Sequence, residues 1–216
     1  MYNNVAPARM SPDARQDQII RVAALHFARD GYDRASMSAI AAEAGVTRPL
    51  VYHYFPNKSA LLEAVLQHEA DALLEATCPD RSRSPEENLR AALAAFLDHF
   101  SLRAGGGLHL DLFADGVPRV SAKFARANHA IQASRIVALL DLEDGPLVQS
   151  TLVAWLEFVT ALAREAVDHS AISHDSLILI CMRALYALVD GLKTAPAVKV
   201  GGPSLNPRSK TRKARK

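Results

Sequence analysis

The residues best suited to contact a partner lie between Ser36 and Lys58. Two short amphipathic helices are expected here, over residues 37–44 and 48–55, joined by a tight turn at Gly45. Two short helices joined by a glycine-containing turn describe a helix-turn-helix, whose second helix enters the major groove of DNA. The segment therefore predicts a nucleic-acid interface.

Charges at the helix starts support this interpretation. Most long helices in the chain begin with acidic residues, such as Asp13, Glu86 and Asp175, as the helix dipole prefers. Arg48 and Lys58 instead occupy first turns, where a cation is unfavourable by about 0.3–1 kcal/mol. A bound DNA phosphate would remove this penalty, which would explain why cations occur at these positions. The alternative explanation is that water solvates both charges and that neither has a partner.

The start of the second helix is suited to reading bases. With Val51 and Phe55 in the core, Arg48 projects outward and can donate to guanine O6 and N7. The apolar Pro49 and Leu50 beside it can contact thymine methyl groups. Four further side chains are suited to phosphate contacts, namely Thr47, Tyr52, His53 and Lys58.

The run from Ala44 to Lys58 resembles the N-terminal domain of the tetracycline-repressor (TetR) family. The resemblance covers about residues 15–66 and includes Ile40-Ala41, Leu61-Leu62, Phe27, Gly31, Tyr32 and Ser36. It implies an all-helical homodimer whose small domain binds a palindromic operator and whose larger domain binds a small-molecule effector. It implies that Thr47, Tyr52 and Lys58 lie at phosphate-contact positions and that Arg48, Pro49 and Leu50 lie at the base-reading start of the recognition helix. With Ser36 and His53, these residues make up the eight expected DNA contacts. Pro49 departs from the pattern, because many members have glycine there.

The rest of the chain predicts an all-α fold of about nine helices. Alanine and leucine dominate, and glycine and proline cluster between long periodic segments. We expect an N-terminal tail, a DNA-binding domain, an effector-binding and dimerisation domain that begins with a connecting helix (57–76), and a basic tail. Their expected bounds are 1–10, 11–56, 57–192 and 193–216.

The last two long helices are apolar nearly all round, so they must be covered on nearly all sides. They predict an isologous dimer interface, and an ordinary central core pair is the alternative. The family resemblance places the interface on the same helices. Its candidate residues are Leu152, Leu156, Val159, Leu177, Cys181, Leu185 and Leu188.

The resemblance also implies an effector pocket among the middle helices. Its candidates are Phe96, His99, Phe100, Phe113, Phe124, Trp155 and Phe158, with His109 and His129 as further polar members. For any one of these residues, a core position is the simpler interpretation, because aromatic residues are common in protein cores.

Composition excludes several other classes. The longest stretch without a charged residue, Gly145 to Leu156, has 12 residues and falls short of the ~17 that span a bilayer. Cys78 and Cys181 form neither a disulfide framework nor a zinc cluster. Catalytic and nucleotide-binding motifs are missing, and His109 with Asp111 lacks further metal ligands. We therefore expect a cytoplasmic protein that is not an enzyme and binds no cofactor or metal.

The near-neutral net charge of +2 hides three segments of different character. Residues 1–60 carry +2, residues 61–192 carry −8 and residues 193–216 carry +8. The acidic middle would repel DNA, and the basic end either adds phosphate contacts or only solubilises the chain. The expected function is a ligand-released repressor, and the alternative is a helical binding module that does not bind DNA.

Overall fold

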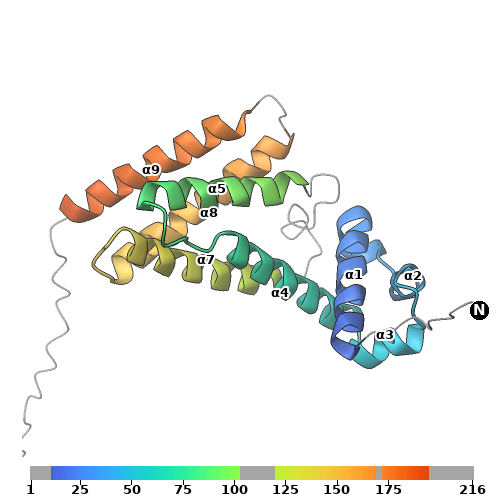
Figure 1. Cartoon of the computed structure of the whole chain (residues 1–216). Coiled ribbons are helices and arrows are strands. Elements are labelled where there is room, and N and C mark those ends of the chain that lie inside the picture. The colour runs from blue at the N-terminus through green and yellow to red at the C-terminus, as the bar shows by residue number, and fades with distance from the viewer. Residues whose placement is uncertain (1–10, 103–119, 169–171, 195–216) are drawn as a thin grey trace, which may run out of the picture.

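The structure, a computed structural model, describes residues 11–102, 120–168 and 172–194. Every regular element in these ranges is an α-helix, which confirms the expected all-α fold. A small N-terminal domain adjoins a larger helical bundle, and one long helix runs between them (Figure 1). The helices are α1 (Pro12–Arg34), α2 (Met37–Glu43), α3 (Arg48–Tyr54), α4 (Lys58–Ala76), α5 (Pro85–Leu102), α7 (Val120–Leu139), α8 (Pro146–Asp168) and α9 (His174–Thr194).

The N-terminal domain is built around one apolar core. Helices α1, α2 and α3 bury Ile19, Phe27, Ile40 and Val51 with at most 1% of each side chain exposed. The first half of α4 completes this core with its buried residues Leu61, Leu62, Val65 and Leu66. The connecting helix thus shares a core with the helix-turn-helix, so the position of α4 and that of α3 are linked.

Side-chain caps mark the beginnings of α1, α3 and α4. Ser11 accepts a hydrogen bond from the Ala14 amide at 3.2 Å, Thr47 from Leu50 at 3.4 Å, and Asn57 from Ala60 at 2.8 Å. Helix α2 differs: the sequence predicts Ser36 as its N-cap, but the Ser36 hydroxyl makes no capping bond and only its carbonyl accepts, from Ile40.

Gly31 breaks α1 just before its end. Its φ of 74° and ψ of 162° lie in a region that is essentially restricted to glycine. Tyr32, Asp33 and Arg34 therefore leave the helix axis, and the chain turns into α2. A Cβ at this position would meet no atom within 4 Å, so backbone conformation alone imposes the requirement for glycine.

Gly31→Ala is expected to destabilise the protein by about 1–3 kcal/mol, because alanine must adopt that strained conformation. Denaturant unfolding at one fixed protein concentration measures the loss. Gly191→Ala is the matched control, because Gly191 lies within α9 without positive φ and its Cβ would also be unhindered. Equal stability of the two variants would contradict the role of Gly31.

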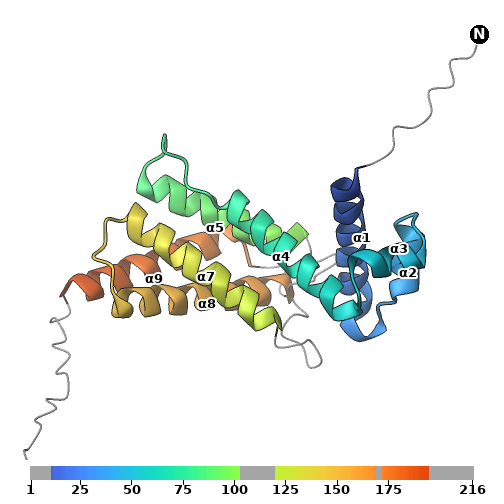
Figure 2. The same ribbon diagram turned by 90° about the horizontal axis from the view of Figure 1, so that it is seen from below.

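The larger domain is a bundle of α5, α7, α8 and α9 with the second half of α4 (Figures 1 and 2). Its core contains Leu152, Trp155 and Val159 of α8 against Cys181 and Leu185 of α9. The Trp155 indole N–H donates to the Cys181 carbonyl at 3.0 Å, which fastens α8 to α9. Glycines on both sides of Leu108 to Ala114 predict a short separate segment there, and it lies outside the described residues.

Candidate nucleic-acid interface

Helix α3 presents its first residues to solvent. Val51 and the C-cap Phe55 are buried beneath it, and this fixes which face points outward. The structure exposes six of the eight expected DNA-contact residues and half-buries the other two, Leu50 and Lys58. The six exposed residues are Ser36, Thr47, Arg48, Pro49, Tyr52 and His53.

Arg48 and Tyr52 form a pair on this outer face, one helical turn apart. The Arg48 guanidinium carbon lies 5.4 Å from the centre of the Tyr52 ring, and Nη2 donates to the Tyr52 hydroxyl at 3.5 Å. The contact holds the guanidinium over α3 and leaves its other N–H groups available. A guanidinium positioned in this way can make two hydrogen bonds to one guanine.

Lys58 lies elsewhere and makes different contacts. Its ammonium donates to the carbonyl oxygens of Tyr32, Asp33 and Ala35 at 2.7, 3.0 and 3.3 Å. It also lies 4.5 Å from the centre of the Tyr32 ring. The cation at the start of α4 is therefore offset by the carbonyl end of α1, and no DNA phosphate is needed to explain it.

A buried histidine fixes α1 against α2. His26 is 3% exposed, and its Nε2 lies 2.8 Å from a Glu43 carboxylate oxygen at the end of α2. Its Nδ1 lies 3.1 Å from Nη2 of Arg29, which also pairs with Asp30. The first helix of the helix-turn-helix is thus held by polar contacts as well as by the apolar core.

A row of polar side chains on α7 holds the far end of α4. Asn128 donates to the Ala70 carbonyl at 3.3 Å, and Arg135 donates to the Leu74 carbonyl at 2.7 Å. Gln132, between them on the same face, donates to the Thr77 hydroxyl at 2.5 Å. The sequence analysis did not single out this row, although the spacing 128, 132, 135 places three polar side chains on one helix face.

A cavity of about 60 Å³ lies beside this row of polar side chains. Apolar side chains of α5, α7 and α8 form most of its wall, and Thr77, Asn128, His129 and Gln132 supply the polar part. Three expected pocket residues, Phe96, Trp155 and the polar His129, line it. Burial lowers the pKa of His129, and its contact at 3.1 Å with the Glu157 carboxylate offsets part of the shift.

Protonation of His129 is expected to destabilise the fold. Its pKa is lower in the folded chain than the ordinary value of about 6.5, so the unfolded chain binds this proton more readily. The loss of stability caused by this protonation is absent well above pH 6.5, and it grows as the pH falls toward the pKa of His129 in the folded chain. Unfolding measured at pH 8 and pH 5.5 should show a smaller acid loss for His129→Gln than for the parent. His53→Gln, at an exposed histidine, should match the parent.

The other expected pocket residues are dispersed. Phe124 packs against the N-terminal core, and His99 lies 3.8 Å from the buried Glu69 carboxylate. Phe158 lies on the outer surface of α8. The side chain of Phe100, and Phe113 and His109, lie outside the part of the chain that the structure describes.

The predicted dimer interface is wrong for most of its seven residues, because the helices of the same chain bury them. The fully enclosed ones are Leu152, Val159, Leu177, Cys181 and Leu185, each at most 3% exposed. Burial also raises the pKa of the Cys181 thiol to about 11. Leu156 is half-buried, and Leu188 alone of the seven is clearly exposed, at 38%.

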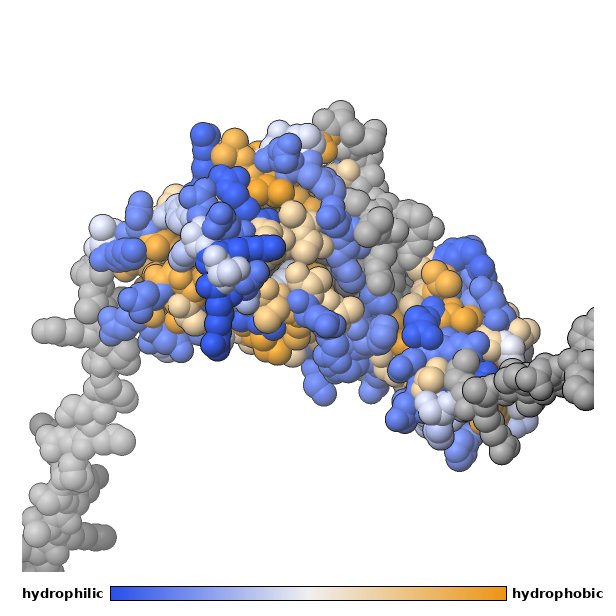
Figure 3. All heavy atoms as spheres, in the orientation of Figure 1, coloured by the Kyte–Doolittle hydropathy of each residue, from blue (hydrophilic) through white to orange (hydrophobic). Residues whose placement is uncertain are grey.

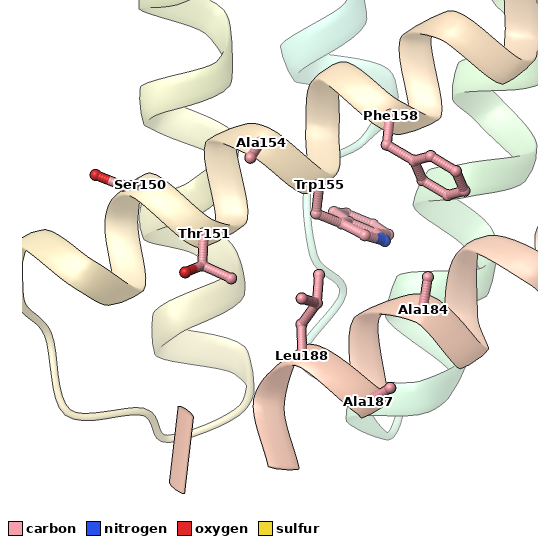
Figure 4. A pocket seen from close by; sticks show the side chains of 8 residues that line it. All are labelled: Ser150, Thr151, Ala154, Trp155, Phe158, Ala184, Ala187 and Leu188. Atoms are coloured by element: carbon pink, nitrogen blue, oxygen red, sulfur yellow. The ribbon is translucent and has the colours of Figure 1, made fainter. Parts of the chain in front are cut away.

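The same two helices carry a second apolar face on their outer side. A groove of about 670 Å³ runs between them, and Trp155 and Phe158 of α8 face Ala184, Ala187 and Leu188 of α9 across it (Figure 4). Phe158 is 39% exposed and Ile180, one turn before Ala184, is 49% exposed. We define the outer face of α8 and α9 as Leu147, Ala154, Phe158, Ile180, Ala184 and Leu188.

Helix α8 is long and apolar enough to cross a membrane by composition, although 28% of that stretch is buried within the protein. Core helices of soluble proteins pass the same test. Apolar patches also interrupt the hydrophilic surface of the larger domain in the view of Figure 3. Among the described residues, no group of three or more His, Cys, Asp or Glu side chains is arranged to hold a metal ion.

Comparison with known proteins agrees with this geometry. Residues 19–65 match the family model of bacterial regulatory proteins of the tetR family. The chain is 38% identical over 97 residues to the HTH-type transcriptional activator FasR of Mycolicibacterium smegmatis, which covers 42% of each protein. It is 36% identical over 84 residues to the HTH-type transcriptional regulator BetI of Ectopseudomonas mendocina, covering 39% of this chain and 43% of BetI. The chain thus spans about two fifths of the length of these relatives.

Solved structures extend the likeness to the larger domain. A tetR-family transcriptional regulator from Streptomyces coelicolor superposes with a TM-score of 0.69 at 25% identity, covering 86% of this chain and 85% of that one. The regulator FadR from Bacillus subtilis, solved with stearoyl-CoA, shares the fold with a TM-score of 0.56 at 20% identity, covering 81% and 98%. The N-terminal domain thus matches the tetR family of bacterial regulatory proteins, and the fold as a whole is similar to that of a solved tetR-family regulator.

Proposed function

We propose that the protein is a homodimeric, ligand-responsive transcriptional regulator that binds a palindromic operator through α3. The exposed start of α3 is the observation that carries the proposal. Arg48, Pro49 and Leu50 lie there over a rigid core, with one cationic and two apolar side chains directed at a partner. The proposal assigns no catalytic role to any residue.

The outer face of α8 and α9 supports the dimer. It is apolar and grooved, and it lies on the bundle, apart from α3 (Figures 1 and 4). A second copy of this face would cover it in an isologous contact. Two recognition helices about one DNA turn apart, roughly 34–36 Å, would then match the two halves of a palindrome.

The cavity beside α7 supports ligand control. It adjoins Gln132 and Thr77, whose hydrogen bond helps to hold the end of α4. An effector bound there would compete for these groups and favour a different position of α4. FadR, which shares the fold, was solved with stearoyl-CoA, and this supports a small-molecule site in the larger domain.

We propose that the protein represses transcription, because a dimer on an operator that overlaps a promoter excludes polymerase. The relative FasR is named an activator, so the reporter assay must be able to detect both a decrease and an increase in transcription. We also propose a cytoplasmic location, because a regulator of this kind acts on chromosomal DNA.

Selection from a random DNA library tests the proposal. It should yield a palindromic site, and the affinity for this site should fall steeply with salt, since phosphate contacts release counterions. If no sequence is enriched and binding to DNA is undetectable at low salt, the helical binding module without DNA is the better description.

A further inference from the structure

We propose that the cavity beside α7 takes a small, uncharged ligand with an apolar body and one hydroxyl group, such as a short alcohol. This ligand class rests on the proposed function, in which the cavity holds the effector. The size of the cavity sets the first limit. Its volume of about 60 Å³ holds roughly four to six water-sized groups, since each takes about 10–15 Å³. An alcohol of about four or five carbon atoms has this size.

The polar side of the cavity is buried and oriented. Thr77, Asn128 and His129 line it and are each at most 8% exposed. Asn128 donates one N–H to the Ala70 carbonyl, and Gln132 donates one to the Thr77 hydroxyl. Among the described residues, the second N–H and the carbonyl oxygen of each amide make no bond. These groups leave both donors and acceptors for a ligand.

His129 adds an acceptor without adding a charge. Its Nδ1 lies 3.1 Å from the carboxylate of Glu157, which only accepts, so Nδ1 carries the proton and Nε2 keeps a lone pair. Burial lowers the pKa of His129, and the ring is therefore uncharged at neutral pH. A hydroxyl group both donates and accepts, so it can bond to this nitrogen and to an amide at the same time.

The lining does not suit an ionic ligand. None of the described residues that line the cavity is an aspartate, glutamate, lysine or arginine. A carboxylate or an ammonium would be buried there without a counter-charge, which costs far more than burying a hydrogen-bonded hydroxyl. A pure hydrocarbon would fit the apolar walls, but it would leave the buried polar groups without a partner. The hydroxyl group is therefore the part of the ligand that the cavity selects.

A titration of the DNA-free protein with 1-butanol, butanoate and butylammonium at neutral pH tests the ligand class. Trp155 is the only tryptophan of the chain and lines the cavity, so its fluorescence reports binding. All concentrations must leave the circular dichroism of the helices unchanged. 1-Butanol should bind at least about tenfold more tightly than either ion. Equal or tighter binding of an ion, or no binding of 1-butanol, would overturn the proposal.

Gln132→Lys should reverse the preference toward butanoate, because it places a cation at the polar side of the cavity. Ser134→Lys is the matched control, since it adds the same charge at an exposed position of α7 outside the cavity, and it should keep the parent preference. If a folded Gln132→Lys protein also kept that preference, the fluorescence would report binding elsewhere, such as in the groove that Trp155 also lines, and the proposal would fail. The titration of the parent decides the ligand class whether or not this variant folds.

Operator binding separates this proposal from the proposed function. Bound 1-butanol should weaken the operator complex of the parent, and butanoate should not. If the parent binds no DNA, the proposed function fails, and the fluorescence titration still decides the ligand class. If 1-butanol binds and the operator affinity stays the same, the cavity is not the effector site and the assigned effector class is overturned.

Discussion

Phe158→Glu is expected to produce monomers that no longer bind the operator tightly. Phe158 lies in the middle of the outer face of α8 and α9, and an isologous interface would bury it twice. Losing the burial of one phenylalanine costs about 1.5–3 kcal/mol, or about 3–6 kcal/mol for the two copies, so the dimer constant should fall roughly 150- to 20,000-fold. Sedimentation velocity across a concentration series, with operator binding on the same samples, measures both effects.

Ile131→Glu is the matched control for this experiment. Ile131 is 45% exposed on α7 and is absent from the groove between α8 and α9. It should remain a dimer with the parent affinity for DNA. A Phe158→Glu protein that stays dimeric at micromolar concentration would place the interface on another surface.

Arg48→Ala is expected to remove discrimination at one base pair in each half of the operator. A guanidinium that makes two bonds to guanine contributes about 1–3 kcal/mol, or roughly 5- to 150-fold per half-site. Tyr52→Phe should have a smaller effect, because it removes the hydroxyl bonded to Arg48 and keeps the ring beneath the guanidinium. Competition binding with operators changed one base pair at a time measures the preference.

The control for Arg48 is Arg81→Ala, at an exposed arginine in the connection between α4 and α5. It removes the same charge far from α3 along the chain and should leave every base preference intact. If Arg48→Ala weakened all operators equally and kept their ranking, Arg48 would be a phosphate contact and base readout would lie with other residues.

The local structure of the N-terminal domain could be predicted from the sequence. Capping by Ser11, Thr47 and Asn57 depends on residues three positions apart, and the break at Gly31 depends on one glycine. Short-range patterns of this kind need no knowledge of the fold. The exposed start of α3 followed from the same patterns, once Val51 and Phe55 were assigned to the core.

Two assignments required the tertiary structure. Lys58 is 26 residues from Tyr32 along the chain, so its carbonyl acceptors cannot be read from local spacing. On α8 and α9 two apolar faces coexist, and periodicity selected the more apolar one, which includes Leu152 and Leu185. That face is the bundle's own core, and the face left for a partner is richer in alanine.

The attachment of α4 at both ends makes this helix a rigid arm of known length. Its 19 residues extend about 28 Å, from the Lys58 junction at one end to the bonds of Arg135 and Gln132 at the other. A tilt of about 5° therefore displaces one end by about 2.4 Å relative to the other. A displacement near Thr77 would therefore be carried along α4 to the N-terminal domain, which shares its core with the first half of this helix and is bonded to it through Lys58.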